Sequence, residues 1–83
     1  MATANSTLIY TPITRSDGAS GVATLHTEKG RTLRIGGAFT ALREYPRVGY
    51  EVAVDRVNQL VWVRDPTDRD PDDPGRPFSL LGA

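Results

Sequence analysis

The stretch VATLHTEKGRTLRI, residues 22–35, decides the fold of this 83-residue chain. Residues 22–27 and 31–35 each alternate apolar with polar side chains, and residues 28–30, which end in glycine, separate the two runs. Alternation with a period of two is typical of a half-buried strand, and a short connection ending in glycine is typical of a hairpin. The stretch therefore predicts a β-hairpin.

One face of this hairpin is expected to be apolar and to pack on a core. The side chains that share this face alternate along both strands: Ala23, Leu25, Leu33 and Ile35. The opposite face carries threonine, arginine and the only histidine of the chain, His26. Because successive side chains of a strand point to opposite sides, this pattern predicts a sheet with one buried and one solvated surface.

Three further segments have the character of strands. Residues 48–57 alternate most regularly, and residues 60–64 are apolar on both faces, which is typical of a strand covered on both sides. Asn58 and Gln59 are expected to form a two-residue turn between them. Residues 7–11 are rich in β-branched and aromatic side chains and precede Pro12. They predict a short strand at a sheet edge.

Two segments interrupt the strands. Residues 14–21 have the composition of a loop, and Asp17-Gly18 within them is a strong turn signal. Residues 38–45 place apolar side chains at helical spacing and precede Pro46, which favours a short helical turn, although part of the segment suits a strand equally.

The end of the chain differs from the rest in composition. Residues 65–77 contain four of the six prolines and five of the ten acidic residues, which predicts an extended linker. Residues 78–83 are mostly apolar and are expected either to dock on their own domain or to bind a partner. The expected organisation is a barrel domain (1–64), a linker (65–77) and a docking segment (78–83).

Together these elements predict an all-β fold. We expect a small curled sheet or barrel, SH3-like or incomplete OB-like, with one short helical turn and an extended acidic C-terminal tail, because barrels remove the sheet edges that a small core cannot protect. A small α+β sheet capped by one helix is the alternative.

Composition reduces the number of functions and locations that the chain can have. The chain has no cysteine, which excludes disulfides and thiolate metal sites. Its longest apolar run, residues 60–63, is far shorter than the roughly 20 residues that cross a bilayer. The first residues lack the basic and apolar regions of a secretory signal. We expect a cytoplasmic protein, or one in a host cytoplasm or virion.

Charge is balanced overall but not along the chain. Residues 1–64 carry a net charge of +3 and residues 65–83 a net charge of −3. The acidic segment is expected to be a solvated tail or, alternatively, to fold back on a basic face and compete there with a polyanion. Nine of the ten basic residues are arginine, a coding bias that hints at a GC-rich genome such as that of an actinobacterium or its phage.

No group of residues predicts catalysis. His26 has no second ligand or base in any motif, and the chain lacks nucleophile and phosphate-loop signatures. Asp68, Asp70 and Asp72 have the spacing of a calcium loop, but Asp73 stands where that loop requires glycine. We therefore expect no enzymatic activity, metal, cofactor or small-molecule substrate.

Binding is the class of function that remains. We expect the partner to be a protein, which can be a second copy of this chain. The residues predicted to carry the contact are aromatic or apolar: Tyr10, Tyr45, Phe78, Leu80 and Leu81. The alternative is a nucleic acid bound on a basic face, formed by His26, Arg31, Arg34, Arg43 and Arg47. A structural virion subunit is a third interpretation. A membrane partner is not expected.

Overall fold

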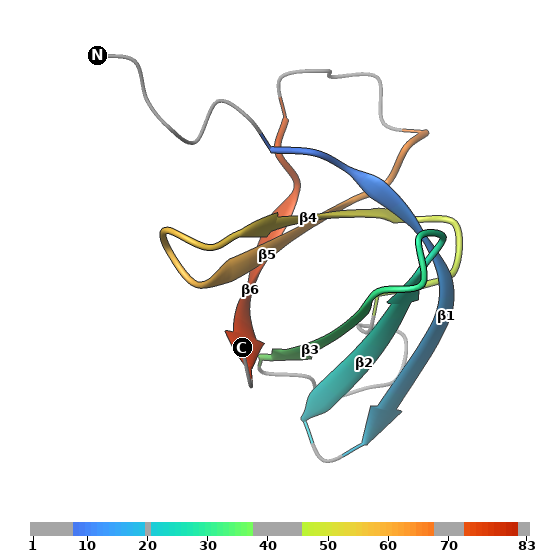
Figure 1. Cartoon of the computed structure of the whole chain (residues 1–83), viewed down its shortest axis with the longest axis horizontal. Helices are drawn as coiled ribbons and strands as arrows, with labels where there is room; N and C mark the ends of the chain where they lie inside the picture. The colour runs from blue at the N-terminus through green and yellow to red at the C-terminus, as the bar shows by residue number, and fades with distance from the viewer. Residues whose placement is uncertain (1–7, 20, 38–45, 68–72, 82–83) are drawn as a thin grey trace.

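The computed structural model describes residues 8–19, 21–37, 46–67 and 73–81, in which six antiparallel strands form a closed barrel (Figure 1). In chain order the strands are β1 (Thr11–Ala19), β2 (Val22–Thr27), β3 (Thr32–Gly36), β4 (Glu51–Asp55), β5 (Leu60–Arg64) and β6 (Arg76–Leu81). Around the barrel their order is β1-β2-β3-β6-β5-β4. The predicted all-β barrel-like fold is confirmed, whereas the helical turn predicted for residues 38–45 lies outside the described residues.

The hairpin of β2 and β3 is confirmed, with the predicted faces. Leu25 lies opposite Leu33 and Ala23 opposite Ile35, and all four side chains are buried. The turn between the strands closes with the Gly30 N–H donating to the Thr27 carbonyl oxygen over 2.9 Å. Gly30 has a φ of 78°, which glycine adopts without a steric penalty.

The core is a single apolar cluster inside the ring of strands. All six strands contribute to it, and its buried members are Ile13, Ala23, Leu25, Leu33, Ile35, Val52, Val61, Val63 and Phe78. Tyr50, Val54 and Leu80 are half-buried and pack against this cluster. Because aliphatic side chains dominate it, the barrel is held mainly by the burial of apolar surface.

The prediction for residues 8–19 was wrong. The first strand is not residues 7–11 but β1, and Asp17 and Gly18, predicted to form a turn, lie within β1 opposite Thr24 and Ala23. β1 has little hydrophobic signal, since Ile13 is its only core residue. Pairing with β2, rather than local propensity, makes this segment a strand.

The fourth strand is shorter than predicted. β4 begins at Glu51, and Val48 and Gly49 form a turn before it, where the Gly49 N–H donates to the Ile13 carbonyl oxygen. The predicted strand over residues 60–64 is confirmed as β5. The turn before it spans residues 56–59 rather than two residues.

The apolar end of the chain is part of the barrel. β6 lies between β3 and β5, with Phe78 opposite Val61 and Leu80 opposite Ile35. Residues 76 and 77, which the sequence placed in the linker, already belong to this strand. Residues 65–75 therefore connect two strands of one barrel, which extends beyond residue 64.

Candidate functional site

The barrel closes unevenly, and its weakest junction lies between β1 and β4. Only Thr11 and Pro12 of β1 pair with β4, opposite Val52 and Glu51. Before Thr11 the chain leaves β4, and Tyr10 stacks instead on Arg64 of β5. We call the gap that this departure leaves beside Val54 the open seam.

The backbone of Val54 faces the open seam. Pro12 has no N–H, so Thr11 and Val52 are the pair that exchanges hydrogen bonds in the ladder of β1 and β4. Hydrogen-bonded positions of an antiparallel ladder recur at every second residue, so Val54 directs its N–H and C=O to the same side as Val52. No described residue pairs with Val54 on that side.

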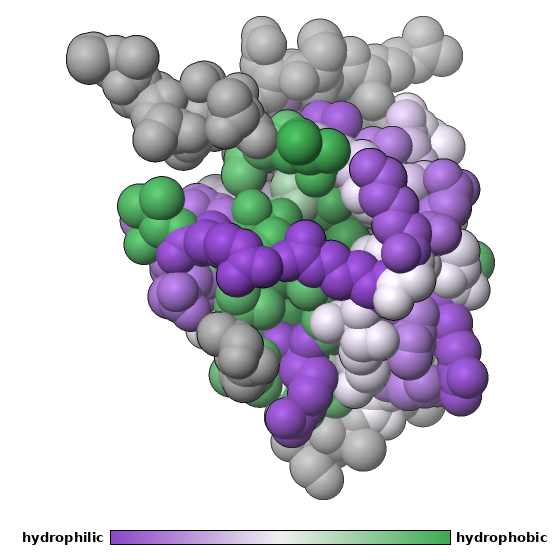
Figure 2. All heavy atoms as spheres, in the orientation of Figure 1, coloured by the Kyte–Doolittle hydropathy of each residue, from purple (hydrophilic) through white to green (hydrophobic). Residues whose placement is uncertain are grey.

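A hollow of about 190 Å³ lies at this point of the barrel. Aliphatic side chains line it together with hydroxyl groups and cations: Ile9, Thr11, Thr27, Lys29, Arg31, Leu33, Val52 and Val54. Ile9 is 71% exposed at its rim, whereas Val52 and Leu33 are buried. Figure 2 shows one face of the molecule on which apolar side chains gather at the centre and hydrophilic side chains surround and cross them.

The turn between β2 and β3 holds the two cations of the hollow. The Thr27 N–H donates to the Arg31 carbonyl oxygen, and the Arg31 N–H donates to the Thr27 hydroxyl over 3.2 Å. These bonds fix the backbone on either side of Gly30, so Lys29 and Arg31 leave the same short turn. Both side chains are exposed, and neither forms an ion pair with any described residue.

This arrangement can hold a small aliphatic group next to an anionic one. The hollow is smaller than the 300–1,000 Å³ of typical small-molecule pockets and accommodates a side chain rather than a whole cofactor. Two cations with no anionic partner in the described part of the chain favour a carboxylate, and the exposed apolar rim favours an aliphatic side chain. Among the lining residues only hydroxyl, ammonium and guanidinium groups are polar.

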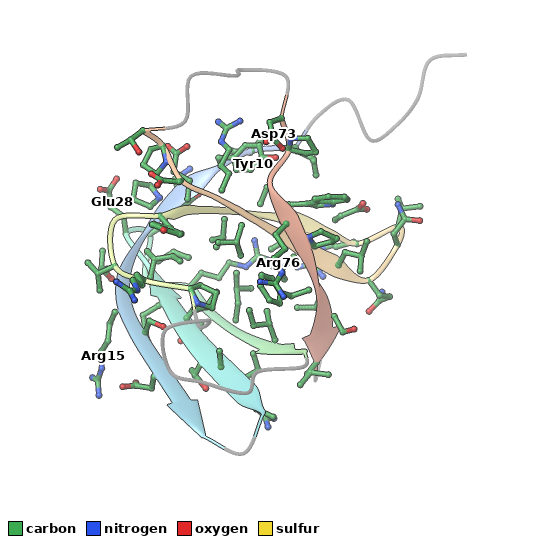
Figure 3. All side chains as sticks on the ribbon, turned by 180° about the vertical axis from the view of Figure 1, so that it is seen from behind. Tyr10, Arg15, Glu28, Asp73 and Arg76 are labelled. Carbon is green, nitrogen blue, oxygen red and sulfur yellow. The ribbon has the colours of Figure 1, made fainter. Side chains whose placement is uncertain are left out.

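Tyr10, predicted to contact a partner, is held by the protein itself. Its ring lies 3.6 Å below the Arg64 guanidinium carbon, and its hydroxyl donates to the Pro74 carbonyl oxygen over 2.8 Å. Arg64 in turn donates from Nε to Glu51 over 3.1 Å. Partial burial raises the pKa of the Tyr10 phenol. Figure 3 shows Tyr10 beside Asp73, so this residue ties the start of β1 to the segment that leads into β6.

The other described residues predicted to bind a partner lie in different parts of the barrel. Phe78 is buried in the core and Leu80 is half-buried against it, while Arg76 lies with its guanidinium carbon 5.1 Å from the Phe78 ring (Figure 3). Leu81 lies on the outside of the barrel, where its methyl groups pack over Gly36. Tyr45 is outside the described residues. The described side chains of this set do not form one surface.

The basic residues predicted to form a nucleic-acid face are also dispersed. His26 and Arg34 lie on the outer face of β2 and β3, Arg31 lies at the hollow, and Arg47 is in the segment before β4. Arg43 is outside the described residues. Only Arg31 belongs to the open seam.

His26 lies between a hydroxyl and a carboxylate. Its Nδ1 is 3.5 Å from the Thr32 hydroxyl, and its Nε2 is 3.7 Å from Asp17, which also forms an ion pair with Arg15 over 3.3 Å. The order hydroxyl, imidazole, carboxylate is that of a nucleophilic triad, but both distances exceed those of working proton transfer. The sheet face around it is solvated, and Arg15 competes for the carboxylate.

The sequence analysis missed most of the hollow. Lys29, Thr11, Ile9 and Val54 were not among its candidates, because each looked like an ordinary turn, strand-end or core residue. Pro12 is no signal of the seam either, because it lies within the paired stretch, opposite Glu51.

Comparisons with protein-family models, with curated proteins and with solved structures give no match for this chain. The described residues contain no group of three metal-ligating side chains placed to hold an ion. They also contain no helix with the length and apolar character needed to span a bilayer. The hollow at the open seam is therefore interpreted from its own geometry.

Proposed function

We propose that this protein is a non-enzymatic module that binds another protein, and that it does so at the hollow of the open seam. The partner contributes a peptide segment with an aliphatic side chain next to a carboxylate. One observation carries the proposal: Lys29 and Arg31, without anionic partners among the described residues, stand at the rim of an aliphatic hollow.

The lining of the hollow favours a peptide over a single-stranded nucleic acid. Nucleic acids bind to small barrels by stacking their bases on aromatic side chains, and none of the eight lining residues is aromatic. The described aromatic residues are engaged elsewhere, as Tyr10 is by Arg64 and Trp62 by its hydrogen bond to Asp55. Aliphatic walls instead match an aliphatic side chain.

The test uses a fluorescent synthetic peptide with the repeat leucine-serine-aspartate-serine and measures its affinity by anisotropy. We expect Lys29→Glu combined with Arg31→Glu to weaken binding at least tenfold, because both charges facing the carboxylates are reversed. Arg47→Glu is the matched control, since it reverses an exposed cation that does not line the hollow. It should change affinity less than twofold.

A second peptide and a nucleic acid complete the test. The peptide with asparagine in place of aspartate should bind at least tenfold more weakly, and added salt should reduce this difference. An oligothymidylate should bind more weakly than the acidic peptide. No measurable binding of the acidic peptide, or equal binding by the double variant, would contradict the proposal. Tighter binding of the oligonucleotide would favour the nucleic-acid interpretation instead.

A further inference from the structure

We infer that the partner segment binds as an added β-strand, pairing with the backbone of Val54 where β1 departs from β4. This inference rests on the proposed function, because it specifies how the acidic peptide lies in the hollow. The segment continues the ladder of β1 and β4 beyond its last pair, Thr11 and Val52. It therefore adds a strand at the junction of the barrel with the fewest paired residues.

β4 has hydrogen-bonding capacity that none of the described residues uses. Because Val52 directs its backbone groups to β1, the alternation of the ladder makes Ala53 with Trp62, and Asp55 with Leu60, the pairs that exchange hydrogen bonds with β5. Val54 directs its N–H and C=O to the other side, where β1 has left. Val54 is half-buried, and its backbone N–H and C=O gain partners when an extended chain lies alongside. These hydrogen bonds stabilise the complex.

The position of the Val54 side chain also favours an added strand. Val54 lines the hollow, as Val52 does two residues earlier on the same face of β4. A residue placed opposite Val54 in an antiparallel strand points its side chain to that same face. Pairing with Val54 therefore directs one side chain of the added strand into the hollow.

The extended form of the added strand sets the spacing of the recognised side chains. In an extended segment the side chain two residues further along lies on the same face, about 6–7 Å away. When an aliphatic residue lies opposite Val54, the side chain two residues further along the segment points to the rim, where Lys29 and Arg31 lie. The recognised pattern is an aliphatic and an acidic residue separated by one residue. The residue between them faces outward and is free to vary.

The experiment measures amide hydrogen exchange of the full chain by NMR, with and without a saturating amount of the leucine and aspartate peptide. We expect exchange of the Val54 amide to slow at least tenfold on binding. The Ala53 amide is the matched control, because the alternation of the ladder directs its N–H to β5, and its exchange should change less than twofold. N-methylation of the peptide residue that pairs with Val54, found by methylating each position in turn, should weaken binding at least tenfold.

The outcomes separate this inference from the proposed function. If the peptide binds and depends on Lys29 and Arg31, but Val54 exchange is unchanged and no N-methyl group matters, the strand-addition mode is wrong and the binding site stands. If the peptide does not bind at all, both the proposed function and the strand-addition mode are wrong. If a peptide with its aliphatic and acidic residues adjacent binds as tightly as one with them separated by one position, the proposed spacing is wrong.

Discussion

The two sides of β4 are paired very differently. Toward β5, all five residues of β4 face a partner, from Glu51 opposite Arg64 to Asp55 opposite Leu60. Toward β1, only Glu51 and Val52 face a partner, and the pairing stops before Val54. We call the first side, which continues from β5 into β6, the closed side; the second is the open seam.

This difference separates stability from recognition. The closed side contains the buried pair of Val61 and Phe78 and the turn held by Asp55, so it supplies packing and hydrogen bonds that water cannot replace. The open seam leaves a hollow, two cations at its rim, and backbone groups of Val54 that pair with no described residue on that side. A closed barrel protects its edges, and a ligand can exploit the place where closure is incomplete. Changes on the closed side should therefore affect folding first.

The largest effect is expected from truncating a core side chain on the closed side. Phe78→Ala removes a buried aromatic ring and should lower the free energy of unfolding by about 3–5 kcal/mol. Ile9→Ala at the open seam removes a side chain that is mostly in water and should cost less than about 0.5 kcal/mol. Urea denaturation followed by circular dichroism measures both.

The Phe78 variant must be accompanied by a milder one, since a small domain has only about 5–15 kcal/mol of stability. Phe78→Leu keeps an apolar side chain and should cost about 1–2 kcal/mol while the barrel remains folded. Equal costs for Phe78→Leu and Ile9→Ala would contradict the division between the two sides. Truncation after residue 64 should abolish folding, because it removes β6 from between β3 and β5.

Sequence patterns predicted the part of the fold that is regular. Ala23, Leu25, Leu33 and Ile35 alternate strictly, so both the hairpin and its buried face were found. β1 was missed because only one of its residues enters the core, and an extended segment held by its neighbour has no pattern of its own. The membership of β6 in the barrel depends on contacts between distant residues, which no local pattern contains.

The candidate site could be predicted even less well. Arg31 was proposed for a basic face, but the hollow that gives it a role is made by residues from four strands and two adjoining segments. Whether Val54 has a backbone partner depends on where β1 leaves β4, which is a property of the assembled barrel. Tyr10 and Phe78 were selected as exposed anchors because a large side chain looks alike in sequence whether it binds a partner or fills a core.

A pair of glycines tests the two sides with the same backbone angle. Gly75, which packs against β5 on the closed side, and Gly49, in the turn before β4 on the side of β1, both have a φ of 98°. A Cβ at Gly75 would overlap the Val63 carbonyl, whereas one at Gly49 would meet nothing within 4 Å. Gly75→Ala should lower the free energy of unfolding by about 2–4 kcal/mol and Gly49→Ala by about 1 kcal/mol.

Chemical denaturation of both glycine variants gives the difference directly. The shared φ makes the conformational cost common to the two, so the excess at Gly75 reports the overlap with β5. Equal costs would mean that the turn before β6 moves away from Val63 freely. The closed side would then be less tightly packed than the paired strands indicate.

The smallest effect is expected from acid, and it too belongs to the closed side. The Asn58 side-chain amide and backbone N–H, and then the Trp62 indole, donate to Asp55 and hold the pKa of its carboxyl below the ordinary value. A carboxyl whose pKa is lower in the folded than in the unfolded state stabilises the fold above the unfolded pKa of about 4, and this contribution is lost as the pH falls through the folded pKa. The free energy of unfolding should therefore decrease on acidification below about pH 4. It should decrease less steeply in Asp55→Asn, which cannot titrate, and in Asn58→Ala, which loses the amide donor but keeps the carboxyl. Urea denaturation at several pH values between 5 and 2 measures the slopes, and an Asp55→Asn slope as steep as that of the unchanged protein would assign the acid sensitivity to carboxyls outside the turn of β4 and β5.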